Sequence, residues 1–194
     1  MISKDLFESL PNFEAYFQMI KELFAEGKTT GNNQSDKFIE YTQLSIARTK
    51  RGLKTLMPSD MLLIAAERST RKNWLIITEA WCGDAGNIIP LIVNLAKAID
   101  FVELKFILRD QHPDIMDLFL TNGGRSIPVF VAMDENMNYV THWGPRPKPA
   151  QDMVMDNKRN PRENYEDFQI DLQKWYIQDK GKTLDQELIE YFNK

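Results

Sequence analysis

The segment Trp74-Leu75-Ile76-Ile77-Thr78-Glu79-Ala80-Trp81-Cys82-Gly83-Asp84-Ala85 decides the fold of this chain. Its first five residues are aromatic, aliphatic or β-branched without polar alternation, which predicts a strand buried on both faces of a sheet. Residues 83–99 continue with apolar positions at helical spacing, and Glu103 to Leu108 read as a second buried strand. A strand, a helix and a strand in this order predict a βαβ unit with a right-handed crossover.

The segment after this unit predicts a further helix and two strands. A helix is expected from His112 to about Leu120, where Asn122-Gly123-Gly124 ends it. Strands are expected at Pro128 to Met133 and Asn138 to Trp143, and the turn between them is short enough for a hairpin. The expected fold class is therefore α/β, with a mixed sheet of about four strands and helices on both faces.

The residues before the first strand predict only helices. An apolar stripe from Leu6 to Phe24 is divided by Pro11 and ended by Gly27. A second helix is predicted from a cap at Ser35 or Asp36 to about Thr49, and a third from a cap at Ser59 or Asp60 through Arg68. Residues 1–70 are expected to pack on the core as an N-terminal helical extension.

The residues after the last strand predict a connector and two helices. Gly144-Pro145-Arg146-Pro147-Lys148-Pro149 reads as an extended connector because of its three prolines. One helix is expected around Tyr165 to Tyr176, ended by Gly181, and a capping box at Thr183 predicts the last. We expect residues 71–145 to form the core and residues 146–194 to add this connector and these helices, within one compact domain.

Composition excludes several classes of protein. Apolar residues make up 43% of the 194 residues and charged residues 27%, which is typical of a soluble globular protein. The net charge of −4 gives no electrostatic footprint for nucleic acid. No apolar stretch approaches the length of a membrane span, and residues 1–20 carry charges that a secretory signal lacks. We expect a cytoplasmic protein that binds neither nucleic acid nor membrane.

Cys82 is the single cysteine of the chain, so no disulfide can close within it. It lies just before a predicted helix, whose free N–H groups and positive dipole end lower the pKa of a thiol. Asp84 raises that pKa by like-charge repulsion, and the residues alone do not decide between the two effects. Cys82 is thus either a nucleophile or a small buried apolar residue, the usual fate of a lone cysteine.

Trp81-Cys82-Gly83-Asp84-Ala85, with Pro90 in the next helix, resembles the active-site segment of thioredoxins. Ser126-Ile127-Pro128-Val129 resembles the thioredoxin loop whose cis-proline packs against the active cysteine. The resemblance covers residues 72–144 and is closest to bacterial thioredoxin-like proteins with Trp-Cys-Gly-Asp and Trp-Gly-Pro-Arg-Pro stretches, the latter at residues 143–147 here. It implies a thioredoxin fold and a cis peptide bond before Pro128.

Two departures from the thioredoxin pattern limit the chemistry. Ala85 stands where thioredoxins have the resolving cysteine, so dithiol reductase activity is excluded for the isolated chain. Ile76 stands where they have the buried aspartate that assists that cysteine. What remains is attack by Cys82 on a protein disulfide or a glutathionylated protein, with an external low-molecular-weight thiol releasing the mixed disulfide.

The predicted site is Cys82 as the catalytic residue, with substrate bound by Trp81, Gly83, Asp84, Ile127 and Pro128. Substrate would pair with the backbone of Ile127. Trp81 reads as a packing residue that shields the thiol. No cofactor is expected beyond the external thiol, and the sequence does not determine whether the protein is a monomer or a homodimer.

Two other functions stay open. One is a thioredoxin-fold binding or scaffold protein without redox chemistry. A monothiol-glutaredoxin-like cluster site is a weaker alternative, because Asp84 and Ala85 replace the last two residues of Cys-Gly-Phe-Ser. No metal site is expected, since His112 and His142 are far apart in sequence and no second cysteine accompanies them.

Overall fold

The computed structural model describes residues 2–193 and is built on one four-stranded sheet. The strand order is β2-β1-β3-β4, with β1 parallel to β2 and the other two pairs antiparallel. The strands are β1 (Asn73–Thr78), β2 (Glu103–Leu108), β3 (Val129–Met133) and β4 (Tyr139–Trp143). This is the predicted mixed sheet, with β1 and β3 at its centre.

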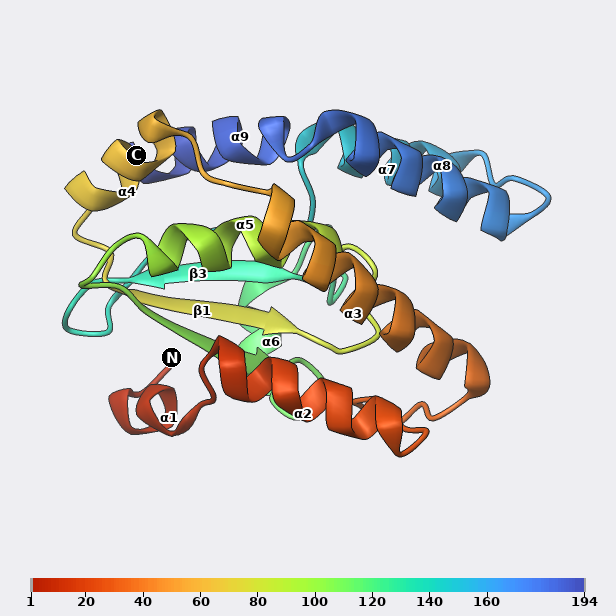
Figure 1. Cartoon of the computed structure of the whole chain (residues 1–194), viewed down its shortest axis with the longest axis horizontal. Helices are drawn as coiled ribbons and strands as arrows, with labels where there is room; N and C mark the ends of the chain where they lie inside the picture. The colour runs from red at the N-terminus through yellow and green to blue at the C-terminus, as the bar shows by residue number, and fades with distance from the viewer. Residues whose placement is uncertain (1, 194) are drawn as a thin grey trace.

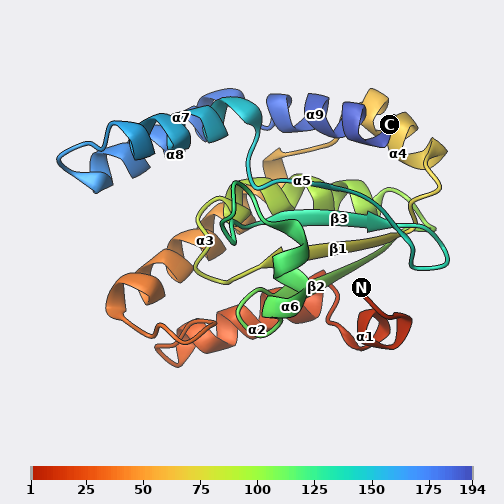
Figure 2. The same cartoon turned by 180° about the vertical axis from the view of Figure 1, so that it is seen from behind.

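Helices cover the sheet from both sides (Figure 1). In that view α1 and α2 lie below the sheet and α5 lies above it. Helix α3 runs diagonally past the right-hand end of the strands, and α4, α9, α7 and α8 form the uppermost row; Figure 2 shows the same arrangement from behind. The bounds of the helices are α1 (Lys4–Ser9), α2 (Phe13–Ala25), α3 (Asp36–Thr55), α4 (Asp60–Arg68), α5 (Ala85–Lys97), α6 (Pro113–Met116), α7 (Lys148–Arg159), α8 (Tyr165–Asp179) and α9 (Lys182–Phe192).

Aromatic side chains join the flanking helices to the sheet. On α2, Tyr16 stacks on Phe106 of β2 at a centroid distance of 4.7 Å. On α9, Phe192 packs on Trp74 of β1 at 5.3 Å, and Trp74 meets Phe130 of β3 edge-on at 5.2 Å. Burial of such large rings supplies much of the driving force for folding. The residues before β1 and after β4 are therefore part of the same hydrophobic core as the strands.

Two glycines let α3 lie directly on α5. A Cβ on Gly86 would come within 2.9 Å of the Ser45 carbonyl oxygen, and one on Gly52 within 2.6 Å of Pro90 Cγ. Only residues without a side chain permit this approach. The consequence for the site is that α3 passes over the first turn of α5 and carries Arg48 with it.

Several sequence-based expectations about the elements were wrong in detail. The proline-rich stretch is not extended throughout, because α7 begins at Lys148 with Pro149 in its first turn, where the missing N–H of proline costs nothing. The first residue of α9 is Lys182 and its cap is Gly181, so Thr183 lies inside the helix, where its hydroxyl bonds Asp179 instead of capping.

Two further expectations also need correction. The second strand is an edge strand whose fully buried residues are Phe106 and Ile107, because only β1 pairs with it. The second helix runs to Thr55 rather than Thr49, because its close packing on α5 continues to Gly52. Within residues 2–193, no helix has the length and apolar character needed to cross a membrane.

Candidate active site

Cys82 lies in the loop between β1 and α5, with its thiol against the loop that precedes β3. The Sγ donates a hydrogen bond to the carbonyl oxygen of Ile127 over 3.4 Å. The peptide bond from Ile127 to Pro128 is cis. The structure thus brings together the cysteine and the proline loop that the sequence analysis had paired.

A second cis-proline segment supports the first. The bond from Gly144 to Pro145 is also cis, and Gly144 adopts φ +132°. A Cβ on Gly144 would lie 2.5 Å from the carbonyl oxygen of Pro128, so only glycine fits here. The turn after β4 is therefore pressed against the Pro128 loop, and it carries the next residue, Arg146, toward Cys82.

Arg146 and Tyr176 hold the side chain of Asp84. The Arg146 guanidinium bonds one carboxylate oxygen through Nε at 2.8 Å and Nη2 at 2.7 Å. The Tyr176 hydroxyl donates to the other oxygen over 2.9 Å. Both partners of the ion pair are mostly buried, with side chains 12% (Asp84) and 17% (Arg146) exposed. Asp84 is thus fixed by one residue from the turn after β4 and one from α8.

The backbone carbonyl of Gly83 also accepts hydrogen bonds, one of them from the N-terminal helical extension. Its carbonyl oxygen accepts from Arg48 of α3 at 3.3 Å and from the Asn87 amide at 3.2 Å. The Asn87 amide in turn exchanges hydrogen bonds with the Gln173 amide of α8, at 3.0 and 3.1 Å. We call Arg48, Arg146, Gln173 and Tyr176 the polar cover of the Cys82 loop.

Burial raises the pKa of the Cys82 thiol to about 12. The Asp84 carboxylate contributes to this rise, whereas the N–H groups of Ala85 and Asp84 and the Arg146 guanidinium each lower the pKa by less. The helix-terminus effect and the Asp84 effect predicted from the sequence are therefore both present, and desolvation outweighs the first. Cys82 is protonated at neutral pH in this conformation.

Comparison with known proteins agrees with this geometry. A family model described as thioredoxin matches residues 31–164. The chain belongs to the thioredoxin family. A search of the curated proteins finds no match. Membership in the thioredoxin family indicates a redox-type function.

Two solved structures have the same fold as this thioredoxin-family chain. One is a protein of unknown function from Pseudomonas aeruginosa, with a TM-score of 0.63 and 18% identity over 98% of this chain and 96% of that one. The other is an HIV epitope-scaffold, with a TM-score of 0.59 and 19% identity over 98% of both chains. At these identities the likeness concerns the fold alone. It spans the helical additions as well as the core.

Trp81 is held in place by packing on two sides. Its ring lies 5.0 Å from the Phe38 ring of α3, and the Arg109 guanidinium sits 4.8 Å above it. Arg109 also pairs with Asp110 at 2.8 Å. The partly buried Trp81 is thus clamped beside the Cys82 loop, which is the packing role expected for it.

Sequence reasoning missed a buried acid near the site, Glu79. It lies at the end of β1 and is completely buried; one carboxylate oxygen accepts from the Asp110 N–H at 2.8 Å. The other oxygen makes no hydrogen bond within residues 2–193. Burial raises the pKa of this carboxyl group. Ile76, where the family pattern has an acid, is fully buried and apolar, so Glu79 is the buried acid of this strand.

The Cys82 thiol does not lie in an open cleft. Cys82 is only 5% exposed, because the loop that holds it is enclosed by the Ile127–Pro128 loop and by the polar cover. Of the cover, Arg146 had a sequence signal in the Trp143–Pro147 stretch. Arg48, Gln173 and Tyr176 had none, since their role depends on tertiary packing.

The histidines lie apart from this site. His142, on β4, shares a hydrogen bond with the Tyr139 hydroxyl at 2.8 Å, and His112 precedes α6. Within residues 2–193, no group of three or more His, Cys, Asp or Glu side chains is arranged to hold a metal ion.

Proposed function

We propose that the protein carries out thiol–disulfide exchange with Cys82 as its single nucleophile. The Cys82 thiolate attacks one sulfur of a protein disulfide or of a glutathionylated protein; a new S–S bond forms and the second sulfur leaves as a thiolate. An external low-molecular-weight thiolate then attacks the mixed disulfide at its substrate-derived sulfur. This releases Cys82 as a thiolate and leaves a disulfide between the external thiol and the substrate sulfur that Cys82 had bound.

The observation that carries the proposal is the contact between Cys82 Sγ and Ile127, directly before cis-Pro128. The N–H of Ile127 donates to no acceptor within residues 2–193. An extended substrate segment pairing with this free backbone group would present its sulfur beside Cys82. Gly83 and Asp84 directly follow Cys82 in the chain, and in this proposal they meet the same substrate.

The reaction requires the polar cover to move. Cys82 is buried and protonated while Asp84 is held by Arg146 and Tyr176. A substrate that displaces this arrangement would hydrate the thiol, and hydration lowers its pKa. The proposed enzyme is therefore slow with small probes and faster with substrates that open the site.

A second candidate function is that of a binding protein without redox chemistry. It is favoured by the 5% exposure of Cys82 and by the raised pKa of its thiol. A thiol in that condition is inert unless its surroundings change. In this case the covered loop would be a structural element, and partners would bind elsewhere on the protein.

Intact-mass measurement separates the two functions. The native protein is incubated with oxidised glutathione and, separately, with a glutathionylated peptide, with Cys82→Ser as the control. Exchange predicts a glutathione adduct on the native protein alone and a released peptide thiol. If the folded protein acquires no adduct from either donor while the denatured protein does, the redox proposal fails and the binding function remains.

A further inference from the structure

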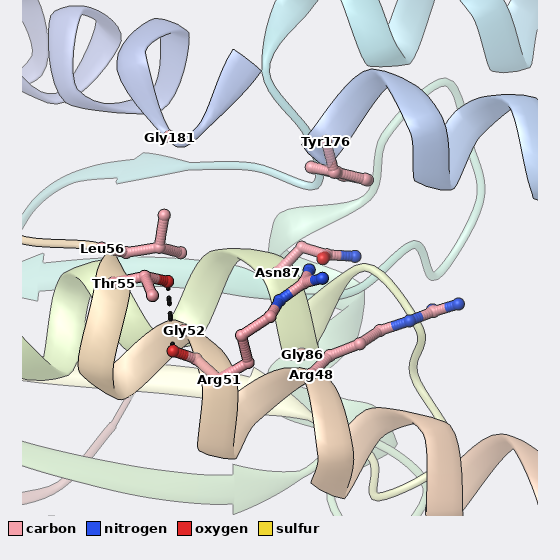
Figure 3. A pocket seen from close by; sticks show the side chains of 9 residues that line it. All are labelled: Arg48, Arg51, Gly52, Thr55, Leu56, Gly86, Asn87, Tyr176 and Gly181. Carbon is pink, nitrogen blue, oxygen red and sulfur yellow. Dashed lines mark hydrogen bonds between the residues drawn. The ribbon is translucent and has the colours of Figure 1, made fainter. Parts of the chain in front are cut away.

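A cavity lies between α3, α5 and the junction of α8 with α9 (Figure 3). It encloses about 30 Å³, more than the roughly 10–15 Å³ that one water molecule needs. Gly86 and Asn87 contribute the first turn of α5, and Tyr176 closes the cavity from α8. There is room for a small ion or for one charged group of a larger molecule.

Two arginines of α3 line this cavity without a carboxylate partner. Neither Arg48 nor Arg51 forms an ion pair within residues 2–193. Figure 3 shows the Arg51 side chain extending from α3 toward Asn87, whereas Arg48 runs past Gly86. Arg51 donates no side-chain hydrogen bond in the described chain, so its guanidinium donors are free.

The other polar groups around the cavity already have partners. The Thr55 hydroxyl donates to the Arg51 carbonyl oxygen, and the Asn87 amide is shared between Gly83 and Gln173. Asp84 is the nearby acid, and its two oxygens are occupied by Arg146 and Tyr176. The guanidinium of Arg51 therefore has no anionic partner within residues 2–193.

We propose that this cavity is an oxyanion-binding site, which takes a phosphate or a carboxylate group through Arg51, with Arg48 beside it. Guanidinium groups bind both anions through paired N–H donors. The first turn of α5 adds the positive end of a helix dipole. The anion is either free phosphate or a carboxylate of a small thiol such as glutathione. The proposal does not depend on the reactivity of Cys82.

Binding is measured on the full chain by titration calorimetry and by thermal unfolding. The probes are inorganic phosphate and S-methylglutathione, which has carboxylates but cannot exchange thiols, each against chloride at equal ionic strength. We compare Arg51→Gln and Arg51→Lys with the control Lys50→Gln, which removes an exposed charge of α3 outside the cavity. Unfolding without anion shows whether each variant folds.

The expected result is saturable binding of at least one probe to the native protein and to Lys50→Gln. Arg51→Gln should weaken it roughly tenfold, and Arg51→Lys by less, because lysine keeps the charge but loses the paired donors. Phosphate binding alone indicates free phosphate as the ligand, and S-methylglutathione binding indicates the carboxylate. The proposal is overturned if chloride gives the same stabilisation, or if Arg51→Gln and Lys50→Gln behave alike.

Discussion

The two sides of Cys82 are built by different parts of the chain. On the inner side, the β1–α5 loop and the Ile127–Pro128 loop bring sulfur and cis-proline together, as the family pattern implies. On the outer side, α3 and α8 and the turn after β4 contribute the polar cover. The inner side would present the thiol to a substrate, whereas the outer side covers the neighbouring residues Gly83 and Asp84.

The helical additions before and after the core are therefore part of the site. Arg48 comes from the predicted 1–70 extension, and Arg146, Gln173 and Tyr176 come from the predicted 146–194 segment. A core reduced to residues 71–145 would lose every member of the cover. The surroundings of Cys82 therefore include residues that the active-site motif does not contain, and Arg146 among them lowers the pKa of the thiol.

The largest expected effect tests the inner side. In Ala85→Cys, two cysteines take the spacing of the thioredoxin motif, and we expect the folded protein to form one internal disulfide on mild oxidation. Counting thiols after denaturation should give two in the reduced variant and none in the oxidised one. A variant that folds but keeps both thiols would show that the loop lacks thioredoxin geometry.

Asp84→Asn tests the outer side by removing the charge at the centre of the cover. It leaves the mostly buried Arg146 without a partner, and we expect a loss of about 3 kcal/mol in the free energy of unfolding. The pKa of Cys82 should fall, because the carboxylate that raises it is gone. Denaturant titration and the alkylation rate measure the two effects.

The matched control for Asp84→Asn is Asp156→Asn. It breaks the ion pair of Asp156 with Arg159 on α7, in which both side chains are mostly exposed. Stability and alkylation rate should both stay at their native values. If the two variants lost the same stability and had the same alkylation rate, the buried pair of Asp84 and Arg146 would contribute no more than an exposed pair.

The pH dependence of stability tests the burial of the thiol. The Cys82 pKa is raised from 9.0 in the unfolded chain to about 12 in the folded protein. Its contribution is therefore complete below pH 9 and is lost as the pH rises toward 12, by about 1.4 kcal/mol per pH unit. Buried tyrosines such as Tyr16 act in the same direction, so Cys82→Ala is compared with the native protein between pH 8 and 10. Equal slopes in the two proteins would contradict a buried thiol.

The smallest expected effect comes from Tyr176→Phe, which keeps the ring and removes the hydroxyl that bonds Asp84. We expect a loss of about 1 kcal/mol in stability and faster alkylation of Cys82, though less so than in Asp84→Asn. Tyr165→Phe on the same helix is the control, since its ring is exposed. If the alkylation rate of Cys82 in Tyr176→Phe equals that of the native protein, the Tyr176 hydroxyl does not limit access to the thiol.

The sheet could be predicted almost completely because its signals are local. The β1 strand was placed to within one residue and β2 with the correct bounds, and Ser59 caps α4 as expected. The errors concern residues with two roles. Proline can end a helix or lie in its first turn, as Pro149 does in α7. The Thr183 hydroxyl can cap α9 or donate to another acceptor, and here it donates to the Asp179 carboxylate.

The site could be predicted only in its inner half. The pairing of Cys82 with Pro128 followed from the resemblance, because both motifs lie in the core. The contacts of Asp84 with Arg146 and Tyr176 join residues 62 and 92 positions apart, and no local pattern indicates them. The balance between the helix terminus and desolvation at Cys82 also depends on burial, which only the folded chain defines.

The most direct test of the account is the alkylation rate of Cys82 in the folded protein as a function of pH. A covered thiol with a pKa of about 12 predicts a rate that rises about tenfold per pH unit from pH 7 to at least 10, always below that of the denatured chain. A rate that levels off below pH 8 and exceeds that of the denatured chain would contradict the account, because the helix terminus would then outweigh burial.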